Sequence, residues 1–443
     1  MSGSLTPGSV STKQARIAML AKQIQGAALR SLSHNMDLEW MREAYRRTRK
    51  DGAVGVDGVT ASEFAADLDL NLQELLDRAK SGAYRAPPVR RVEIPKGDGK
   101  TRCLGIPTFG DKVLQRALVM LLEPVYEQEF YDFSHGFRPG HSAHSAYSAL
   151  YDGLWAMRGG WVLDADVSKF FDTIDRKQLQ KVLRKRVVDG VAVRLIGKWL
   201  NAGVMSEGCI VHPTAGTPQG GVISPLLANI YLHEVLDHWW VEEVLPRLKG
   251  RAFLIRYADD FVMAFSEEQD ALRVREVLAR RLDRFGLTLH HEKTRLVRFL
   301  RPKHDGGGPR SGTFDFVGFT LFWARSRRGF WALKAKTARG RFTRSLCALK
   351  EWMAVHRHAP VAVQAEVLAR KLRGHYNYYG VPGNSNAIAR FRHEVIERWY
   401  RALSRRSQRY LTRKRYFSIL RRHPLPPARL PPWRLRQLRL ANV

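Results

Sequence analysis

The stretch that decides the fold is residues 251–265, which read RAFLIRYADDFVMAF. Its two apolar runs are rich in β-branched and aromatic residues, a composition typical of half-buried strands, and the Ala-Asp-Asp break between them suits the tip of a hairpin. Adjacent carboxylates at such a tip can be presented rigidly to a divalent metal ion. Acidic pairs in turns usually serve the turn itself, so this stretch alone leaves both interpretations open.

The charge of the chain is the second clue. Its 443 residues have 74 Lys and Arg against 42 Asp and Glu, a formal net charge of +32. Self-repulsion of this size favours a polyanionic partner, and nucleic acid is the first candidate. A basic protein at a membrane surface is the alternative, but no apolar run of about 18 residues is present. We therefore expect no membrane partner, and two or three domains from the length.

The cysteines and the first residues bear on compartment. Cys103, Cys209 and Cys347 are far apart and form no Cys-x-x-Cys pair, which argues against a zinc ribbon or a disulfide framework. The opening residues, MSGSLTPGSVSTKQ, have no apolar segment of a secretion signal. We expect a disordered lead-in and an intracellular, cytoplasmic location, in a bacterium.

A histidine-containing loop follows at residues 134–145, SHGFRPGHSAHS. The spacing of His135, His141 and His144 suggests zinc, but no Cys or Glu nearby completes a ligand set. We therefore expect no zinc and interpret the loop as a shaped one that contacts a template backbone.

A basic hairpin is predicted over residues 89–108, VRRVEIPKGDGKTRCLGIPT, with its turn at 96–100. It would place Lys96, Lys100 and Arg102 on one edge, where cations can hold a triphosphate through charge-assisted hydrogen bonds. A solvated basic hairpin explains the same residues equally well. Helices are predicted on either side, over 62–81 with Ser62 as N-cap and over 111–127.

A second acidic strand is predicted in residues 161–171, WVLDADVSKFF. Asp164 and Asp166 would share one face of it, and alternation alone does not say which one binds a metal. Pairing this strand with the 251–265 hairpin would bring carboxylates from three positions together. Acids so crowded repel one another unless cations lie between them, and oxygen ligands suit Mg²⁺.

Residues 215–237, AGTPQGGVISPLLANIYLHEVLD, begin with a Gly-rich turn and continue as an apolar helix. A turn followed by a core helix explains the apolar residues. It does not explain the glycines, which let a backbone approach something flat, or Gln219, which has both donor and acceptor atoms. Beyond it we expect a helix over 267–286, a strand within 287–300 with Lys293 on or near it, and a strand over 313–321.

The C-terminal part is strongly basic. From Trp331 to Val443 it has 26 Lys and Arg against 4 acids, a net of +22. Apolar faces predict three helices, around residues 342–353, 361–372 and 388–403. Basic and aromatic residues are interleaved, which suits phosphate contact and base stacking more than a merely solvated face. The RNA-binding residues we predict here are Arg373, His375, Tyr376, Tyr378, Tyr379, Arg405, Arg406 and Arg409.

Seven stretches resemble, in order, those of the group II intron-encoded reverse transcriptases, or maturases. The similarity runs from about Asp37 to beyond Arg422, and LRGHYNYYGVPGN (372–384) resembles the maturase motif of that family. The combination of the fifth and sixth stretches is highly specific. The seven are GVDGVT, IPKGDGKTRCLGIP, SHGFRPGHSAHSA, DADVSKFFDTID, GTPQGGVISPLLANIYL, RYADDFV and LTLHHEKT.

The resemblance implies an α+β fold. It would be a right-hand polymerase with fingers and palm, built on antiparallel sheet, over residues 37–325, followed by an α-helical thumb/maturase (X) domain over 330–422. Residues 1–36 would be a flexible basic extension, and 423–443 a basic, Pro- and Arg-rich tail. The endonuclease domain that many members carry after the thumb is not expected.

The resemblance also implies roles for individual residues. Asp166, Asp259 and Asp260, joined by the backbone of Val167, would hold two Mg²⁺ ions, with Mn²⁺ as a substitute. Asp164 becomes an accessory acid. Phe171 would be a gate that favours dNTPs, and Lys293 a proton donor to the leaving pyrophosphate. Nucleotide binding is implied for Lys96, Arg102 and Gln219.

We therefore expect an RNA-directed DNA polymerase that uses an RNA template, a DNA primer and dNTPs. As a second function, the resemblance implies binding of a structured group II intron RNA to assist its splicing and mobility. Two alternatives remain open. One is an intron-free host reverse transcriptase in DNA repair or phage defence, and the other is an RNA-binding splicing factor with an unused polymerase site.

Overall fold

The structure, a computed structural model, describes residues 9–95, 101–206, 209–211, 220–290, 292–303, 310–326, 328–406 and 411–430. The chain divides into two compact units. The first comprises Met1–Ala146 and Ala165–Arg295, and the second Tyr147–Asp164 and Leu296–Val443. The division runs through two strands of one sheet, and the boundary expected near residue 325 lies inside the second unit.

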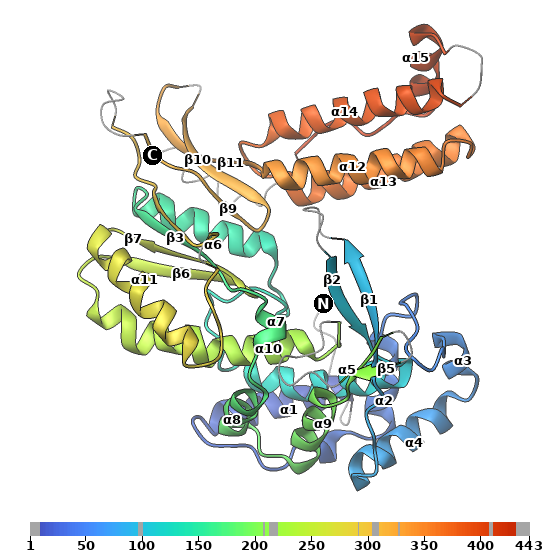
Figure 1. Ribbon diagram of the computed structural model, residues 1–443, viewed down its shortest axis with the longest axis vertical. Helices are drawn as coiled ribbons and strands as arrows, with labels where there is room; N and C mark the ends of the chain where they lie inside the picture. Colours follow the sequence, from blue (N-terminus) through green and yellow to red (C-terminus); the bar gives the residue numbers. More distant parts are fainter. Residues whose placement is uncertain are drawn as a thin grey trace. The chain divides into compact units, whose positions relative to one another are not determined.

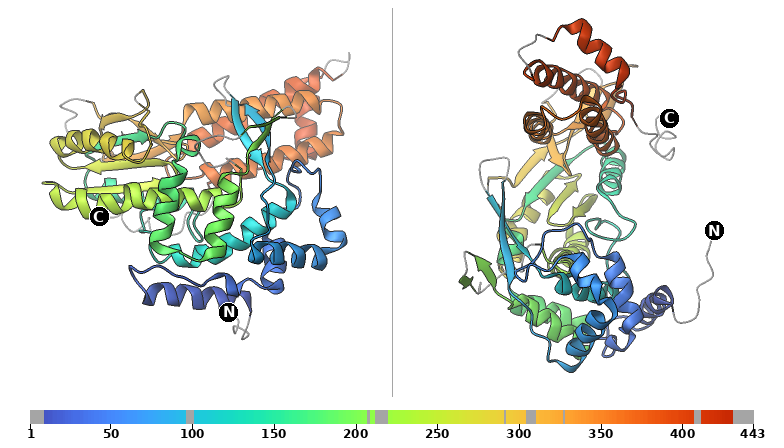
Figure 2. Two further views of the ribbon diagram at one scale, coloured as in Figure 1. Left: turned by 60° about the horizontal axis from the view of Figure 1, so that its bottom comes forward. Right: turned by 90° about the vertical axis from the view of Figure 1, so that its right-hand side faces the viewer.

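The helical part of the first unit is organised around α5 (Phe109–Tyr126), which is buried along most of its length. Such a helix is apolar on nearly all sides because other elements surround it. The buried Trp40 donates from Nε1 to the carbonyl of Ala117 on α5 (3.0 Å). The other helices of this part (Figure 2) are α1 (Val10–Gln23), α2 (Leu38–Arg47), α3 (Ala61–Ala66), α4 (Leu68–Ser81), α8 (Arg176–Arg186) and α9 (Gly190–Leu200).

Two helix predictions near the N-terminus are wrong in part. The disordered lead-in was expected through residue 14, but α1 begins at Val10, with Ser9 as a side-chain cap. A single helix capped by Ser62 was expected over 62–81, but α3 and α4 are separate helices. Thr60 begins α3 through a capping box with Glu63, which satisfies two free backbone donors reciprocally.

The predicted basic hairpin is confirmed. β1 (Val89–Pro95) and β2 (Thr101–Ile106) pair antiparallel, and β1 also pairs in parallel with β4 (Val204–Ser206). With β5 (Cys209–Val211), the sheet has the order β2-β1-β4-β5. The turn at 96–100, with Lys96 and Lys100, lies outside the described residues, as does the side chain of Arg102 on β2.

A second four-stranded sheet carries the acidic stretches. Its order is β6-β7-β3-β8, so the strand with Asp166 is a neighbour of the hairpin strand. The hairpin is confirmed, and so is the helix predicted after it, α11 (Glu268–Asp283), which contacts β7 (Figure 1). The strands are β3 (Trp161–Asp166), β6 (Ala252–Tyr257), β7 (Asp260–Phe265) and β8 (Arg295–Arg298).

The apolar helix expected after the Gly-rich turn is α10 (Ser224–Leu232), and it does not end as a regular helix. It continues into two π-helical segments, His233–His238 and Trp240–Val244. π-helical turns add a residue to a turn and are frequent at functional sites. The segment contains a fully buried acid, Asp237.

The second unit combines a three-stranded sheet with three long helices, which are those predicted. The sheet order is β11-β10-β9, and α12, α13 and α14 lie side by side (Figure 1). Its elements are β9 (Phe314–Phe316), β10 (Phe319–Arg325), β11 (Trp331–Thr337), α12 (Arg339–Val355), α13 (Val361–Tyr379), α14 (Ser385–Ser404) and α15 (Arg413–Arg422).

One buried side chain ties the strands of the second unit to its helices. Asn384 accepts from the backbone of Thr337 (3.0 Å) through Oδ1, and its Nδ2 donates to Thr337 Oγ1 (2.9 Å) and to the carbonyl of Tyr379 (2.7 Å). The end of β11, the end of α13 and the start of α14 are therefore joined at one residue.

Two further helices, α6 (Ala143–Ala156) and the single-turn α7 (Phe170–Thr173), precede and follow the acidic strand in the chain. Within the second unit, Tyr147 packs on Phe319 and Trp155 stacks on Trp323. The described part of the chain contains no helix with the length and hydropathy that a membrane span requires. The fold is thus mixed α and β, with antiparallel sheets and a helical C-terminal region.

Candidate active site

The turn between β6 and β7 presents the paired acids. Tyr257 pairs with Asp260 in the register, which leaves Ala258 and Asp259 as a two-residue turn. Ala258 has a left-handed φ of 57°, where a non-glycine residue costs roughly 1 kcal/mol. Backbone strain of this kind persists only where the surroundings impose it, and it concentrates at functional sites.

Asp166 is the last residue of β3, in the strand next to β7. Its carbonyl accepts from the backbone of His290 (2.8 Å), and the following residue, Val167, bridges to Leu289. Its Oδ2 lies 2.7 Å from Nζ of Lys293. The fold thus brings together Asp166 and Lys293, which are 127 positions apart, in an ion pair exposed enough to be weak.

The described part of the chain contains no group of three or more His, Cys, Asp or Glu side chains arranged to hold a metal ion. The predicted acids therefore do not form a ready-made cage of three protein carboxylates. They lie instead at one strand end and one hairpin turn of the same sheet, with a lysine ammonium on Asp166.

The other predicted nucleotide-binding residues are placed unevenly. Phe171 lies in α7, is 8% exposed and meets Phe170 edge-on at 5.2 Å between ring centroids. Lys96 and Gln219 lie outside the described residues, as does the side chain of Arg102. The structure therefore adds no geometry to the roles expected of these last three.

Gly220 gives part of the reason for the glycine-rich turn. Its φ is 113°, and an added Cβ would come within 2.6 Å of the carbonyl oxygen of Gly105 on β2. A side chain here would therefore meet backbone in a conformation that favours glycine. At this position the close approach is to a neighbouring strand, and not to the flat ligand that the sequence suggests.

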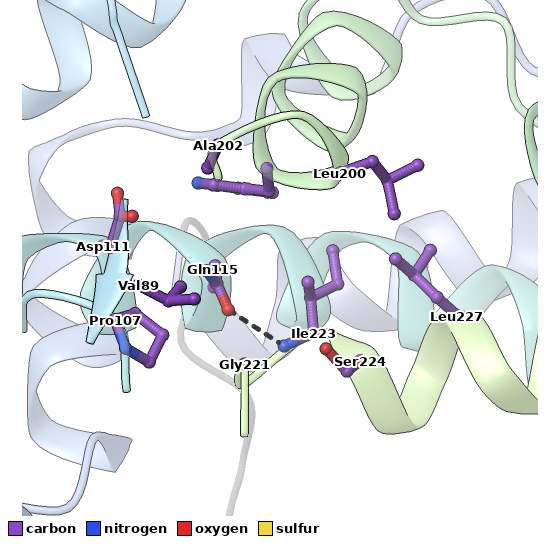
Figure 3. Close-up of a pocket in the computed structure, with 11 residues that line it drawn as sticks. Val89, Pro107, Asp111, Gln115, Leu200, Ala202, Gly221, Ile223, Ser224 and Leu227 are labelled. Atoms are coloured by element: carbon purple, nitrogen blue, oxygen red, sulfur yellow. Dashed lines mark hydrogen bonds between the residues drawn. The ribbon is translucent and has the colours of Figure 1, made fainter. Parts of the chain in front are cut away.

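A small cavity of about 20 Å³ lies beside the start of α10 (Figure 3). Gln115 points into it and accepts from the backbone of Ile223 (3.3 Å). Asp111 also lines it, and burial raises the pKa of Asp111 to about 7. The volume suits one water molecule, so the cavity is a feature of packing and not a nucleotide pocket.

The loop at 134–145 uses its polar groups internally. Arg138 pairs with Glu127 (2.9 Å) and donates from Nη1 to the carbonyl of Ser134 (2.6 Å). His135 lies against His141, with 3.1 Å between their Nδ1 atoms, and burial lowers the pKa of His135 to about 4. Neither Arg138 nor His135 faces solvent, so a template contact from this loop has to come from its exposed residues.

Sequence reasoning missed three residues directly behind the acidic turn, Arg256, Asn229 and Asp237. All three are buried, and hydrogen bonds connect them. A signal existed in the sequence, because charged residues are almost never fully buried unless they are paired. Arg256 interrupts an apolar strand and Asp237 an apolar helix, 19 positions apart.

The predicted RNA-binding residues of the second unit divide by exposure. His375, Tyr376 and Tyr379 are buried, and the ring of His375 stacks on Phe391 with centroids 3.6 Å apart. Tyr378 is 37% exposed, and its hydroxyl donates to the carbonyl of Val317 (2.9 Å). In this structure the three buried rings face the interior of the unit. Arg373 and Arg405 are exposed, Arg406 is partly exposed, and Arg409 lies outside the described residues.

A larger groove, of about 1010 Å³, lies in the same unit. Its lining comes from the three-stranded sheet and from α12 and α14. Four basic side chains outnumber the two acidic ones, a balance that suits a polyanion. The basic residues are Lys336, Arg339, Arg390 and Arg398, and the acids are Asp315 and Glu394.

Comparison with known proteins gives consistent matches. Residues 94–321 match the family model described as reverse transcriptase (RNA-dependent DNA polymerase). Protein YkfC of Escherichia coli K12 is 36% identical over 327 residues, which cover 66% of this chain and 82% of that protein. The group II intron-encoded protein LtrA of Lactococcus lactis subsp. cremoris is 29% identical over 425 residues, which cover 79% of this chain and 70% of that protein. The mitochondrial nuclear intron maturase 1 of Arabidopsis thaliana is 36% identical over 128 residues, which cover 26% of this chain and 17% of that protein.

Proposed function

The chain belongs to the reverse transcriptase family, in its group II intron-encoded branch, and we propose that Asp166, Asp259 and Asp260 are the centre of its RNA-directed DNA synthesis. The observation that carries this assignment is the placement of all three acids at the ends of neighbouring strands, two of them on a strained turn. We also propose the right-hand arrangement of fingers, palm and thumb for the mixed α and β fold described above.

Reverse transcriptases use divalent metal ions, and we propose two Mg²⁺ ions here, with Mn²⁺ as a substitute. The three carboxylates and the carbonyl of Val167 would hold them. Mg²⁺ commonly takes only one or two protein carboxylates and fills its shell with water and substrate phosphate, so a cage of three protein ligands is not required. The Lys293 ammonium, 2.7 Å from Asp166, supports the fit, because a cation beside this carboxylate is sterically possible. When bound, the ions activate the primer 3′-hydroxyl and neutralise charge on the phosphates.

Other residues of this chain complete the proposal. The ammonium of Lys293, 2.7 Å from Asp166, would protonate the leaving pyrophosphate. Phe171 would exclude a ribose 2′-hydroxyl, and Lys96, Arg102 and Gln219 would bind the incoming dNTP. Positioning and electrostatics supply most of the acceleration in phosphoryl-transfer reactions. These substrates place the reaction inside the cell.

Primer extension on poly(rA)/oligo(dT) with dTTP and Mg²⁺ tests the polymerase assignment. We expect template-dependent product that EDTA abolishes and that Mn²⁺ restores. UTP should be used far less well than dTTP if Phe171 is the gate, and Phe171→Ala should narrow the difference. Product that persists in EDTA, or that does not depend on template, would contradict the assignment.

We further propose that the protein binds a structured group II intron RNA and assists its splicing and mobility. The similarity to the group II intron-encoded protein LtrA and to the Arabidopsis intron maturase supports this role. The basic groove and the exposed arginines of the second unit offer a surface for RNA phosphates. A splicing assay at moderate salt with a cognate intron RNA tests it, and unchanged splicing with and without protein would contradict it.

Two other functions remain as alternatives. An intron-free host reverse transcriptase would share the polymerase site, and DNA flanking the gene without a ribozyme would favour that alternative. An RNA-binding splicing factor with an unused polymerase site would bind RNA and give no primer extension. The strained acidic turn favours an active polymerase.

A further inference from the structure

Four buried groups meet behind the acidic turn, and we call them the turn frame: Arg256, Asp237, Asn229 and Gly136. They come from β6, from the π-helical segment after α10, from α10 itself and from the loop at 134–145. None of them carries a role in the chemistry proposed above. All of them lie in the first unit.

Arg256 is the centre of the turn frame. Its guanidinium is 0% exposed and forms a two-pronged pair with the equally buried Asp237, including a 2.8 Å contact from Nε. Its Nη1 donates to Asn229 Oδ1 (2.9 Å) and to the carbonyl oxygen of Ala258 (3.1 Å), the left-handed residue of the turn. One side chain therefore connects a carboxylate, an amide and the backbone of the turn.

Gly136 closes the turn frame from the other side. Its carbonyl accepts from Asn229 Nδ2 (2.6 Å). The backbone N–H of the preceding residue, His135, donates to the carbonyl of Arg256 (2.8 Å). A Cβ added to Gly136 would stand 2.2 Å from the backbone nitrogen of Ala258. Nonbonded heavy atoms are normally about 3.5 Å or more apart, so the turn occupies space that only a glycine leaves open.

Stability alone does not account for this arrangement. Burying an ion pair costs desolvation that its attraction barely offsets, and apolar residues of the same volume are often as stable or more so. The rigid fork of an arginine, in contrast, can fix several acceptors in one geometry. The left-handed Ala258 also needs an external constraint, and the carbonyl contact from Arg256 supplies one.

We propose that the turn frame positions the Asp259 and Asp260 carboxylates for catalysis, so that Arg256, Asp237, Asn229 and Gly136 are positioning residues of the polymerase site. This inference rests on the proposed role of the two acids. Turn-frame residues contact neither substrate nor metal. They act through the backbone of the turn.

Gly136→Ala is the most direct test. The added methyl group would push the turn by roughly 1 Å, and a misplacement of that size can lower a rate about 100-fold. We expect kcat to fall about 100-fold, with the apparent KM for dTTP within threefold of wild type. Gly55→Ala is the matched control, because its Cβ would meet the backbone of Thr108 at 2.5 Å instead, and neither glycine has a left-handed φ.

Arg256→Met combined with Asp237→Leu is the second test, since it removes both charges and leaves neither unpaired. We expect this double variant to fold, with RNA affinity within threefold of wild type, and to lose kcat to a similar extent. Two readouts besides activity report on the turn itself. Hydrogen exchange of a peptide covering residues 256–260 should accelerate about tenfold, and Mn²⁺ binding measured by electron paramagnetic resonance should weaken about tenfold.

Asp259→Asn is measured alongside to separate the two proposals. Loss of activity in Asp259→Asn and in both turn-frame variants, with Gly55→Ala active per folded molecule, supports the inference. Loss in Asp259→Asn alone, with folded turn-frame variants fully active, overturns the inference and leaves the polymerase assignment standing. Full activity of Asp259→Asn overturns the assignment and the inference with it.

Discussion

The turn between β6 and β7 and the end of α13 both contain residues that the sequence predicts to be functional, but the two regions place these residues differently. At the turn, polar side chains are placed at a strand end by a buried framework of polar contacts. Near Arg373 to Tyr379, the marked aromatic residues are mostly the buried packing of a helix, and the charges stand outside. Chemical type alone therefore does not reveal a role, because the element decides which side chains face solvent.

The comparison predicts that the two regions fail in different ways when altered. Changes at the turn should remove synthesis and leave folding and RNA affinity intact. Changes to the buried rings of α13 should reduce stability, and changes to the exposed arginines should reduce RNA affinity.

Asp259→Asn gives the largest expected effect. It removes an anionic oxygen at the hairpin tip while keeping the size of the side chain, so primer extension should fall by roughly 10³-fold or more. RNA affinity, measured by filter binding, should stay within about twofold. Asp283→Asn, on the exposed end of α11, is the matched control. Near-normal extension by Asp259→Asn would remove the turn from the active site.

His375→Ala should chiefly affect folding. The ring is buried against Phe391, and truncating a buried aromatic residue costs roughly 3 kcal/mol. Thermal or urea unfolding would measure the loss, with the exposed Asn377→Ala as control. An unchanged unfolding midpoint together with weakened RNA binding would instead show that the ring contacts RNA.

Neutralising Arg373 and Arg405 together should weaken RNA binding about tenfold near physiological salt. For each phosphate that these arginines neutralise, the slope of log affinity against log salt should also become shallower by roughly one in the variant. Filter binding at several salt concentrations measures both quantities. Arg275→Gln on α11, exposed in the first unit, serves as control. A slope that stays the same in the double variant would place the RNA phosphates elsewhere on the protein.

Asp111→Asn should give the smallest effect on activity, and an effect on stability that depends on pH. Burial raises the pKa of Asp111 to about 7 from an ordinary value of 3.8, so the folded chain keeps a proton that the unfolded chain releases. Folding stability therefore falls as the pH rises from about 4 to 7 and levels off above that range. The asparagine variant cannot ionise, so it should be similar to wild type at pH 4 and more stable at pH 8, by up to about 4 kcal/mol for a shift of this size. Melting curves at both values test this, and a pH-independent difference would contradict it.

Strand and helix patterns predicted much of the fold. The hairpin at 251–265, the basic hairpin predicted over 89–108 and the three C-terminal helices are confirmed. The predictions that failed depend on local backbone conformation. Asp67, with a non-helical backbone, separates α3 from α4, and Ser9 caps a helix that begins inside the expected disordered lead-in.

The sequence identified the acids of the candidate site but not the buried residues that contact the acidic turn. Asp166, Asp259, Asp260 and Lys293 stand out by motif, and the fold places Lys293 against Asp166. The bonds of Arg256 to Asp237 and to the turn depend on tertiary packing, which no periodicity encodes. Burial of His375, Tyr376 and Tyr379 could have been predicted, because these residues continue the apolar face of Leu368 and Leu372 at helical spacing.

The Asn384 contacts have a mechanical meaning. A buried amide that lost its partners would cost about 1–3 kcal/mol for each unsatisfied group, so the corner where β11, α13 and α14 meet resists opening. The three-stranded sheet and the helices should therefore move together at that corner. A force applied to α14 would be transmitted directly to β11.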